Sequence, residues 1–553
     1  MILRRLYLYL VSAAALIIVA AGLVLLGGTV LLFAFNDPSA TYSRSSLAIY
    51  TAMSVVALPV WAVHFWFAQR FARRDPYERA SAIRRLYLYF ASLGFSVAAM
   101  IALAQTLSQV LRGVFDNAGF NGETIAQNAW AMVVFAGIWA LHFTIAIRDR
   151  AAVREEGTSA TLRRWYMYVA LLVGLLTMLS STQQLLQLAW TSLVTSHPTY
   201  TIEIGSPAAY ALAGLALWAT HARIIATRYV SDDRHSTLRA LEGFIAVAVS
   251  IVTAIVGASQ ILYYALARTL GVGNPGGADT NVLVAAAGPV SMLLVYGIAW
   301  FLINRRLARD AGTQEADRQA GVRRLYTNLV LLLSLGAWAY GAATLLGTLA
   351  TQLEAPIIGV AAPDWKDPIS LSITLLLVGL AVWITHWRPA PWAADRQSLS
   401  RKLYVWAALL GSVLSILGAG VGVVYVVLQQ AFSATPKLND PANLAFATSL
   451  AILVVAAAVG VYHWRVLRAD SAARPPKAVP ATTVPAVTPT AITTATTTAT
   501  QPATEAEALG PHARRYTLVV TDATDDDVHQ ALAMLPPQAG YHLTATEQTV
   551  DGR

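Results

Sequence analysis

The chain has 553 residues, of which 56% are hydrophobic and only 12% are charged, and its mean hydropathy is +0.54. This composition excludes a soluble class and leaves a membrane protein with several spans. The absence of cysteine excludes disulfides, thiolate metal sites and cysteine nucleophiles. The net charge of +9 would indicate a nucleic-acid partner only if the basic residues clustered on a soluble face.

Apolar stretches of about 20 residues or more are long enough to cross roughly 30 Å of hydrocarbon. Twelve such stretches predict twelve membrane spans and an all-α fold. The first follows two arginines but is much longer than the apolar core of a signal peptide, so it is expected to be a retained span. In chain order the predicted spans are Leu6–Phe35, Leu47–Ala68, Leu86–Leu111, Ala129–Ile147, Trp165–Val194, Ala208–Ala226, Leu241–Ala267, Val282–Ile303, Leu325–Leu353, Ile369–Trp387, Leu403–Phe432 and Leu444–Val466.

The basic residues lie between these spans and predict their sidedness. The N-terminus, the loops after even-numbered spans and the segment through Lys477, together with Arg223 and Arg465 at the adjoining span ends, hold 31 Lys and Arg, whereas the opposite loops hold five. Positively charged loops stay in the cytoplasm. We therefore expect a multi-pass protein of the cell membrane with both termini cytoplasmic. The lipid bilayer then accounts for the charge, and no nucleic-acid partner is expected.

Two motifs recur at intervals of 75 to 85 residues and predict a repeated two-helix hairpin. A basic-aromatic motif begins at Arg4, Arg84, Arg163, Arg323 and Arg401, and a Trp–x–x–His motif ends at His64, His142, His221 and His386, with a weaker copy at His463. Six parallel hairpins result, since each unit has two spans. Their predicted bounds are 1–80, 81–158, 159–234, 235–318, 319–396 and 397–472, and the fourth is degenerate in both motifs.

Both motifs have a simple physical interpretation as interfacial anchors. Paired arginines followed by Tyr or Trp suit the cytoplasmic headgroup region at a helix start. Trp and His three residues apart share one helix face and suit the same region at a helix end. With these motifs, the chain resembles bacterial multi-pass membrane proteins built from a repeated two-helix domain of unknown function. The resemblance covers about residues 1–470 and implies a membrane location without any activity or catalytic residues.

The remaining C-terminal segment changes character twice. Within Pro475–Thr504, 24 of 30 residues are Thr, Ala or Pro, which predicts a disordered linker over residues 473–510. Strand-like YTLVV at Tyr516, a helix opened by Thr524 and Asp527, and YHLTATE at Tyr541 predict a small β-α-β tail over residues 511–553. An unknown cytoplasmic protein is the expected partner of this tail, since the module is too small to be stable alone.

Five histidines near the predicted cytoplasmic helix ends are the first candidate site: His64, His142, His221, His386 and His463. We interpret them as interfacial anchors, and a ring of imidazoles at one depth is also a candidate pH sensor. Transmembrane histidines can instead hold haem, which makes a haem-containing oxidoreductase the third hypothesis for function. We predict no metal and no cofactor.

Amides within the spans form the second candidate site: Gln105, Gln109, Gln183, Gln184, Gln187 and Gln260. Hydrogen bonds between helices are the simple interpretation, and a polar path for an uncharged solute is the alternative. Asp, Glu, Lys and Arg are missing from the middle of every predicted span, which argues against ion-coupled transport. The leading hypothesis is a non-enzymatic scaffold or sensor, ahead of a transporter or channel.

Overall fold

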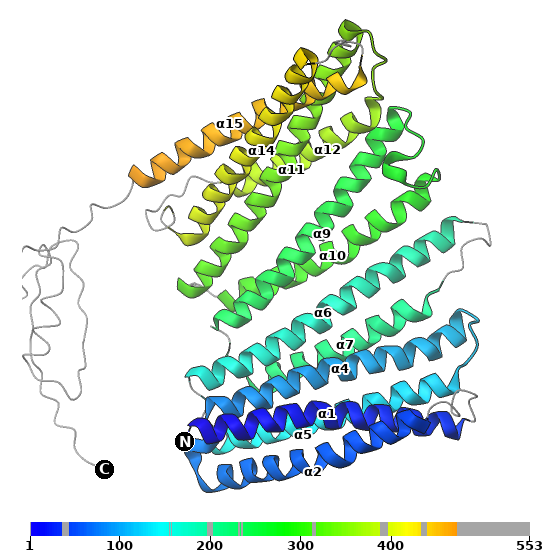
Figure 1. Ribbon diagram of the computed structural model, residues 1–553, viewed down its shortest axis with the longest axis vertical. Helices are drawn as coiled ribbons and strands as arrows, with labels where there is room; N and C mark the ends of the chain where they lie inside the picture. Colours follow the sequence, from blue (N-terminus) through cyan, green and yellow to red (C-terminus); the bar gives the residue numbers. More distant parts are fainter. Residues whose placement is uncertain are drawn as a thin grey trace, which may run out of the picture. The chain divides into compact units, whose positions relative to one another are not determined.

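The computed structural model describes residues 2–35, 44–153, 155, 157–195, 203–229, 233, 236–311, 317–387, 396, 398–432 and 440–472, with the backbone alone for 310–311 and 317–322. Every element in these ranges is helical (Figure 1). The chain divides into two units, Met1–Lys477 and Ala478–Arg553. The predicted linker and the predicted β-α-β tail lie outside the described residues.

Twelve of the described helices are long and apolar enough to cross a membrane, as the sequence predicts. A short helix, α3, and two 3-10 turns, η2 and η3, accompany them. The bounds are α1 Ile2–Ala34, α2 Arg44–Arg74, α3 Pro76–Ala80, α4 Ala82–Phe115, α5 Gly122–Ala152, α6 Gly157–Val194, α7 Gly205–Arg228, α9 Thr237–Thr269, η2 Pro275–Gly277, α10 Val282–Ala311, α11 Asp317–Ile358, α12 Lys366–His386, α14 Leu399–Phe432, η3 Pro441–Leu444 and α15 Ala445–Ala472.

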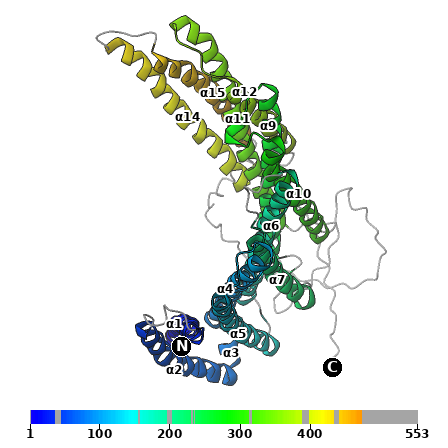
Figure 2. The same ribbon diagram turned by 90° about the vertical axis from the view of Figure 1, so that its right-hand side faces the viewer.

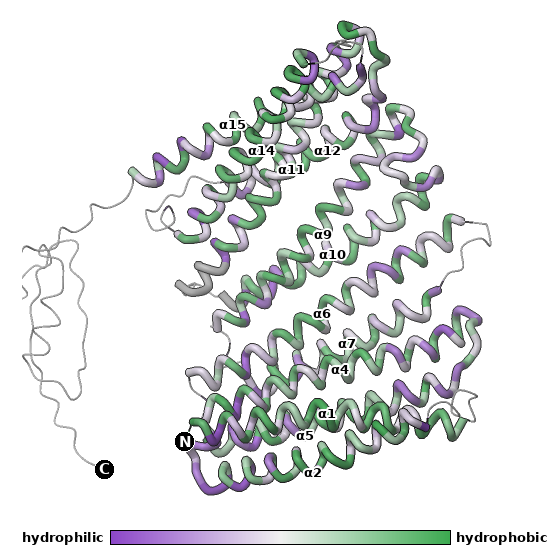
Figure 3. The backbone as a smooth tube through the Cα atoms, in the orientation of Figure 1, coloured by the Kyte–Doolittle hydropathy of each residue, from purple (hydrophilic) through white to green (hydrophobic). Residues whose placement is uncertain are grey.

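Helices dominate because a backbone in hydrocarbon must satisfy its own hydrogen bonds, and an α-helix does so within one segment. The long helices alternate in length along the chain. The first of each consecutive pair has 33 to 42 residues, and the second has 21 to 31. A helix of 33 residues is about 50 Å long and so exceeds the hydrocarbon thickness. Hydrophilic residues gather toward the helix ends (Figure 3).

The long helices pack in consecutive pairs, with loops short enough to make the two members antiparallel neighbours. The pairs are α1/α2, α4/α5, α6/α7, α9/α10, α11/α12 and α14/α15. The first helix of each pair also packs against the second helix of the next pair, so that α1 contacts α5, α4 contacts α7, α6 contacts α10, α9 contacts α12 and α11 contacts α15 (Figures 1 and 2). One packing relation thus recurs at all five junctions.

Small residues allow the two helices of a pair to approach closely. A Cβ added to Gly174 of α6 would lie 2.6 Å from the backbone nitrogen of Trp218, and one on Gly214 of α7 would lie 2.7 Å from the backbone nitrogen of Met178. Close approach of this kind supplies packing energy in a membrane, where lipid removes most of the hydrophobic driving force between helices. Gly379 of α12 makes the same kind of approach to α11.

Candidate functional site

The basic-aromatic motifs lie at one end of the helix pairs, which we call the arginine end. First helices begin there and second helices end there. Arg84, Arg85 and Arg163 are at most 1% exposed, so they do not reach lipid headgroups. This burial corrects the interpretation of these arginines as interfacial anchors. A buried guanidinium requires a partner charge, because desolvation without one is prohibitively costly.

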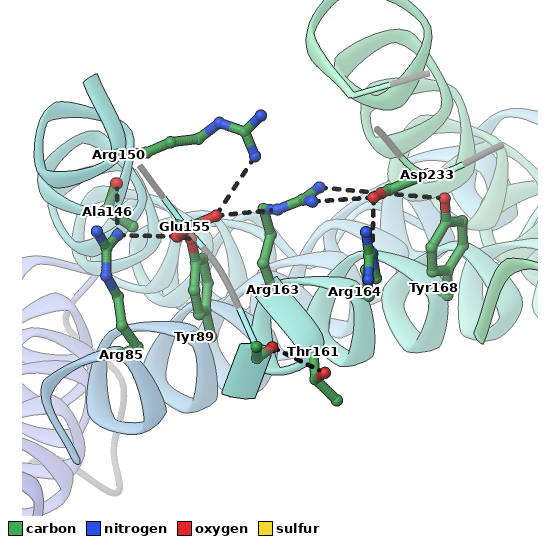
Figure 4. Close-up of polar contacts among 11 residues, drawn as sticks. Arg85, Tyr89, Ala146, Arg150, Glu155, Thr161, Arg163, Arg164, Tyr168 and Asp233 are labelled. Carbon is green, nitrogen blue, oxygen red and sulfur yellow. Dashed lines mark hydrogen bonds and ion pairs between the residues drawn. The ribbon is translucent and has the colours of Figure 1, made fainter. Parts of the chain in front are cut away.

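Two carboxylates, Glu155 and Asp233, provide that charge for Arg85 and Arg163 (Figure 4). Glu155 accepts ion pairs from Arg85 at 2.9 Å, from Arg163 at 3.0 Å and from Arg150 at 3.3 Å. Tyr89 also donates its hydroxyl hydrogen to Glu155. Since Glu155 follows α5 and Arg163 belongs to α6, this carboxylate connects one pair of helices with the next.

Asp233, in the segment between α7 and α9, forms the second half of the same network. Arg163 donates to both of its oxygens at 2.9 Å, and Arg164 donates at 2.8 Å. Tyr168 donates its hydroxyl hydrogen at 3.2 Å. Arg163 therefore bridges Glu155 and Asp233 with bonds to both, and we call the group of Arg85, Arg163, Glu155 and Asp233 the charge bridge.

The charge bridge determines the ionisation of the groups around it that lie outside the spans. Burial by itself would raise the pKa of Asp233, but the hydrogen bonds from Arg163 and Arg164 outweigh it and hold that pKa below its ordinary value. Burial raises the pKa of Tyr229, even though the guanidinium groups of Arg163 and Arg150 lie over its ring. Asp233 is therefore a carboxylate at neutral pH, and Tyr229 is protonated.

The same pairing of a first-helix arginine with an acid in the last turns of the second helix, or just after it, recurs elsewhere. Arg4 and Arg5 of α1 pair with Glu78, the latter at 2.8 Å. Arg401 of α14 pairs with Asp470 of α15 at 2.6 Å. Within the second pair, Arg84 binds Asp149 at 2.6 Å. The arginines of these motifs thus join the start of the first helix to the end of the second helix in the same pair.

Sequence reasoning missed the acidic members of these pairs. The signal was present, because each paired acid follows its arginine by 65 to 74 residues. Single carboxylates in short loops do not form a recognisable motif, and only the helix packing shows which arginine each one meets. The acids concerned are Glu78, Asp149, Asp233 and Asp470.

The tyrosine of the basic-aromatic motif meets the histidine of the same pair and the tryptophan of the preceding pair. Tyr166 lies 2.8 Å from Trp139 Nε1 and 3.0 Å from His221 Nε2. Two further triads have the same connectivity: Trp61, Tyr87 and His142 with bonds of 3.2 and 3.1 Å, and Trp383, Tyr404 and His463 with two bonds of 2.9 Å. We call these the aromatic triads.

The direction of each hydrogen bond in a triad follows from the groups involved. An indole N–H can only donate, so the tyrosine oxygen accepts from tryptophan and donates its own hydrogen to histidine Nε2. The other ring nitrogen, Nδ1, donates to the carbonyl four residues earlier, at 2.8 to 2.9 Å in His142, His221 and His463. These three rings are completely buried, which corrects their interpretation as interfacial anchors.

The remaining two histidines lack a complete triad. His64 is partly exposed and lies 3.3 Å from the Tyr7 hydroxyl. His386 is partly exposed, and its Nδ1 contacts the Val382 carbonyl. In the triads, both ring nitrogens of His142, His221 and His463 are already hydrogen bonded, which leaves neither of them to ligate iron and weighs against the haem hypothesis. Within the described ranges, no three His, Asp or Glu residues are grouped so that they could hold a metal ion.

The glutamines are not brought into one path. Gln183 donates to Gln187 at 3.0 Å and to Ser291 of α10 at 3.0 Å. Gln105, Gln184 and Gln187 are exposed on their helices, and Gln109 is partly exposed. Gln260 lies in a separate cavity between α9, α11 and α12.

The fourth pair, α9/α10, has neither the charge bridge nor an aromatic triad. Its ion pair has the opposite polarity, because Glu242 lies on the first helix and Arg306 on the second, 2.5 Å apart. The fourth pair, which is degenerate in both sequence motifs, therefore keeps the same helix packing but has a different ion pair between its two helices.

Comparison with known proteins agrees with this repeated organisation. No curated protein and no solved structure matches the chain. The family model of a domain of unknown function, DUF5671, matches three times, at residues 5–136, 116–212 and 324–448. The first and third matches each cover one pair of helices and part of the next, the second covers α5, α6 and the start of α7, and the fourth pair lies in the gap between the second and third matches. Since the matches cover more than half of its length, the chain belongs to the DUF5671 family and is a membrane protein with repeated copies of that domain.

Proposed function

We propose that the chain is a non-enzymatic scaffold of the cell membrane, built from six tandem parallel hairpins with both termini in the cytoplasm. In this proposal the hairpins form a rigid membrane base, and residues 473–553 bind a cytoplasmic protein. The observation that carries the proposal is how the reactive side chains at the arginine end are used. In the charge bridge and the aromatic triads they bind one another. Trp139 and His221 border a mainly apolar cavity of about 210 Å³, but the indole N–H and both imidazole nitrogens are already hydrogen bonded within the protein.

A catalytic role would require at least one side chain of the charge bridge or the aromatic triads to be accessible to a substrate. Arg163, His221 and Asp233 are at most 1% exposed. Their hydrogen bonds are made within the protein: Arg163 to Asp233 and Tyr166 to His221 inside the third helix pair, and Arg163 to Glu155 across the junction with the second pair. Arg163 and Asp233 use their polar atoms in these bonds, whereas Arg85 Nε has no hydrogen-bond partner among the described residues. Buried polar groups that are bonded to one another add rigidity and specify one packing arrangement. This arrangement favours a structural role for the arginine end.

The parallel arrangement of hairpins is supported by the recurrence of one junction. At each of the five junctions, the first helix of one pair packs on the second helix of the next pair, which is the relation expected of stacked copies of one unit. The excess of Lys and Arg at the arginine end favours a cytoplasmic position for that end.

Sidedness can be measured directly because the chain has no cysteine of its own. Single cysteines would replace Phe120 and Ile357, at the end opposite the arginines, and Tyr77, at the arginine end; these side chains are 64%, 83% and 80% exposed. A membrane-impermeant maleimide should label the first two on intact cells and the third only after permeabilisation. Labelling of Phe120→Cys without labelling of Ile357→Cys would refute the parallel arrangement.

The scaffold role is tested by comparing the full chain with a chain that ends at Ala472. Both would be expressed in cells, cross-linked and purified, and the recovered proteins quantified by mass spectrometry. We expect one cytoplasmic protein to be enriched at least tenfold with the full chain only. Proteoliposomes containing the full chain should take up glycerol and urea no faster than empty liposomes. Solute uptake by the full chain, with the same proteins recovered from both versions, would reject the scaffold in favour of a transporter.

A further inference from the structure

A cavity of about 340 Å³ lies where the fourth helix pair meets the fifth, between α9, α11 and α12. Its wall is formed mainly by aliphatic side chains, including Val256, Leu333 and Leu375. Val256 is 43% exposed and Leu333 is 52% exposed, so the cavity opens onto the outer surface of the helices. That surface faces lipid in a spanning protein, which means that hydrocarbon has access to the cavity.

The length of the cavity is close to the thickness of one leaflet of a bilayer, and its walls on α11 (330–337) and α12 reach past the middle of these helices toward the arginine end. On α12 its lining extends from Leu371 to Val382, and on α9 from Val252 to Tyr263. Each segment covers 11 steps along a helix, or roughly 16 Å. Half of the hydrocarbon thickness is about 15 Å. An extended acyl chain of one leaflet therefore fits between the two ends.

One end of the cavity is near the membrane boundary. Tyr263 donates its hydroxyl hydrogen to Asp367 at 2.5 Å, and Asp367 lies in the first turn of α12. A tyrosine bonded to a charged group at a helix start is typical of the interface. Gln260 lies three residues earlier on α9, about 5 Å deeper along the helix. This depth is that of the ester groups that join acyl chains to glycerol.

Gln260 also differs from the other polar groups of the cavity wall. Ser259, Ser334 and Thr374 donate their hydroxyl hydrogens to carbonyls of their own helices. Within the part of the chain that the structure describes, the side-chain amide of Gln260 makes no hydrogen bond. An amide in an apolar environment gains free energy by finding a partner. The cavity therefore combines a hydrocarbon slot with one available hydrogen-bond donor at the depth of a lipid ester.

We propose that this cavity binds a glycerolipid from the leaflet opposite the arginine end. One acyl chain occupies the slot between α9, α11 and α12, and the Gln260 amide N–H donates to the ester carbonyl of that chain. The site is independent of the proposed scaffold role, because it uses neither the arginine end nor residues 473–553. It lies at one of the two junctions, both involving the fourth pair, at which the described residues form no aromatic triad, and bound lipid fills the space between two helix pairs there.

Photo-cross-linking can locate the lipid. The full chain would be reconstituted in phosphatidylcholine vesicles that contain phosphatidylcholine with a diazirine in one acyl chain, and labelled peptides would be mapped by mass spectrometry. We expect labelling of residues 252–263 and 371–382 to exceed labelling of the lipid-facing α2 peptide around Ala62 by at least fivefold. Equal labelling of all lipid-facing helices would overturn the proposal.

Cavity-filling substitutions provide the matched test. Ala337→Phe and Leu375→Trp fill the slot from two different walls, and each should lower its labelling at least fivefold. Ala62→Phe makes the same change as Ala337→Phe on an exposed face of α2 and should leave the labelling unchanged. Size-exclusion profiles would identify a variant that fails to fold. Retained labelling in both folded filling variants would contradict the site.

The hydrogen bond is tested with an ether analogue of the same photoreactive lipid, which lacks the ester carbonyl. The ester lipid should label the unaltered cavity about fivefold more strongly than the ether lipid, which corresponds to one neutral hydrogen bond. Gln260→Leu should reduce ester labelling to the ether level, whereas Gln184→Leu, at an exposed position on α6, should have no effect. Equal labelling by both lipids in the unaltered chain would rule out recognition through Gln260.

Discussion

The junction between the second and third helix pairs and the junctions of the fourth pair solve the same packing problem with different chemistry. In the former, Arg163 is 1% exposed and bridges Glu155 and Asp233. Within the fourth pair itself, the ion pair between Glu242 and Arg306 has reversed polarity, and the Arg306 side chain is 31% exposed. The fourth pair meets the fifth across an apolar cavity with no triad nearby. The helix packing is thus kept where the polar motifs are lost, and each completely buried arginine of the motifs has an acid as its partner.

The largest effect is expected where the charge is most deeply buried. Asp233→Asn removes the carboxylate that binds Arg163 and Arg164, and leaves Arg163 with Glu155 alone. Breaking a buried ion pair by removing one partner costs about 3 kcal/mol or more. Unfolding in SDS mixed micelles and hydrogen exchange of α6 and α7 would measure the loss. As a control, Glu242→Gln acts on a more exposed arginine and should cost less.

The Asp233→Asn variant should also change how the stability of the protein depends on pH. The pKa of Asp233 lies below its ordinary value of about 3.9. Its contribution to stability is therefore complete above the unfolded pKa and is lost as the pH falls through the lower folded value. The difference in stability between the unaltered chain and Asp233→Asn should be constant from pH 8 to pH 5 and should narrow below about pH 4. A difference that already narrowed at pH 6 would assign the effect to another group.

Reversing the polarity of an intact pair tests whether the order of charges matters. Arg401 and Asp470 are 12% and 14% exposed. Arg401→Glu alone places two carboxylates together and should cost about 2 kcal/mol, less than in a completely buried pair. Arg401→Glu combined with Asp470→Arg reproduces the polarity of α9/α10 and should recover more than half of that loss. Recovery should be incomplete, because Arg401 also lies over the Trp387 ring. No recovery in the double variant would show that polarity is fixed by other contacts.

An aromatic triad should contribute less than the charge bridge. Tyr166→Phe leaves the Trp139 indole and buried His221 Nε2 without their shared partner. Unsatisfied neutral groups cost about 2 kcal/mol together. The matched control is Tyr326→Phe, since the Tyr326 hydroxyl has no hydrogen bond to any described residue, and its cost should stay within about 0.5 kcal/mol. If both variants lowered the midpoint of thermal unfolding equally, the hydrogen bonds of the triad would have no role in stability.

The smallest effect is expected from helix contact alone. Gly174→Ala places a methyl group 2.6 Å from the backbone nitrogen of Trp218. Because α6 and α7 must then move apart, the variant should lose about 1 kcal/mol of stability. Gly137→Ala adds the same group where nothing lies within 4 Å. It should stabilise the helix by up to about 1 kcal/mol through helix propensity. Opposite shifts of the unfolding midpoint are the expected result.

The sequence predicted a large part of the membrane region. Twelve apolar stretches became twelve long helices, with the first helix of each pair the longer one. The recurring motifs marked residues that do belong to one site, since Tyr166 and His221 come from the two different motifs. Their interpretation as lipid anchors was wrong for Arg84, Arg163 and His142, because hydropathy gives the depth of a residue without showing whether protein or lipid surrounds it.

Apolar length and arginine spacing are local properties, so the sequence alone determined the number of helices, their alternation in length and the position of the motifs. Which side chains contact one another is not a local property of the sequence. Arg163 and Asp233 are 70 residues apart in the chain, and Trp139 joins Tyr166 of the next pair. Only the packing of successive helix pairs decided that these groups meet, that the charges of α9/α10 are reversed, and that Gln260 faces a slot of hydrocarbon dimensions.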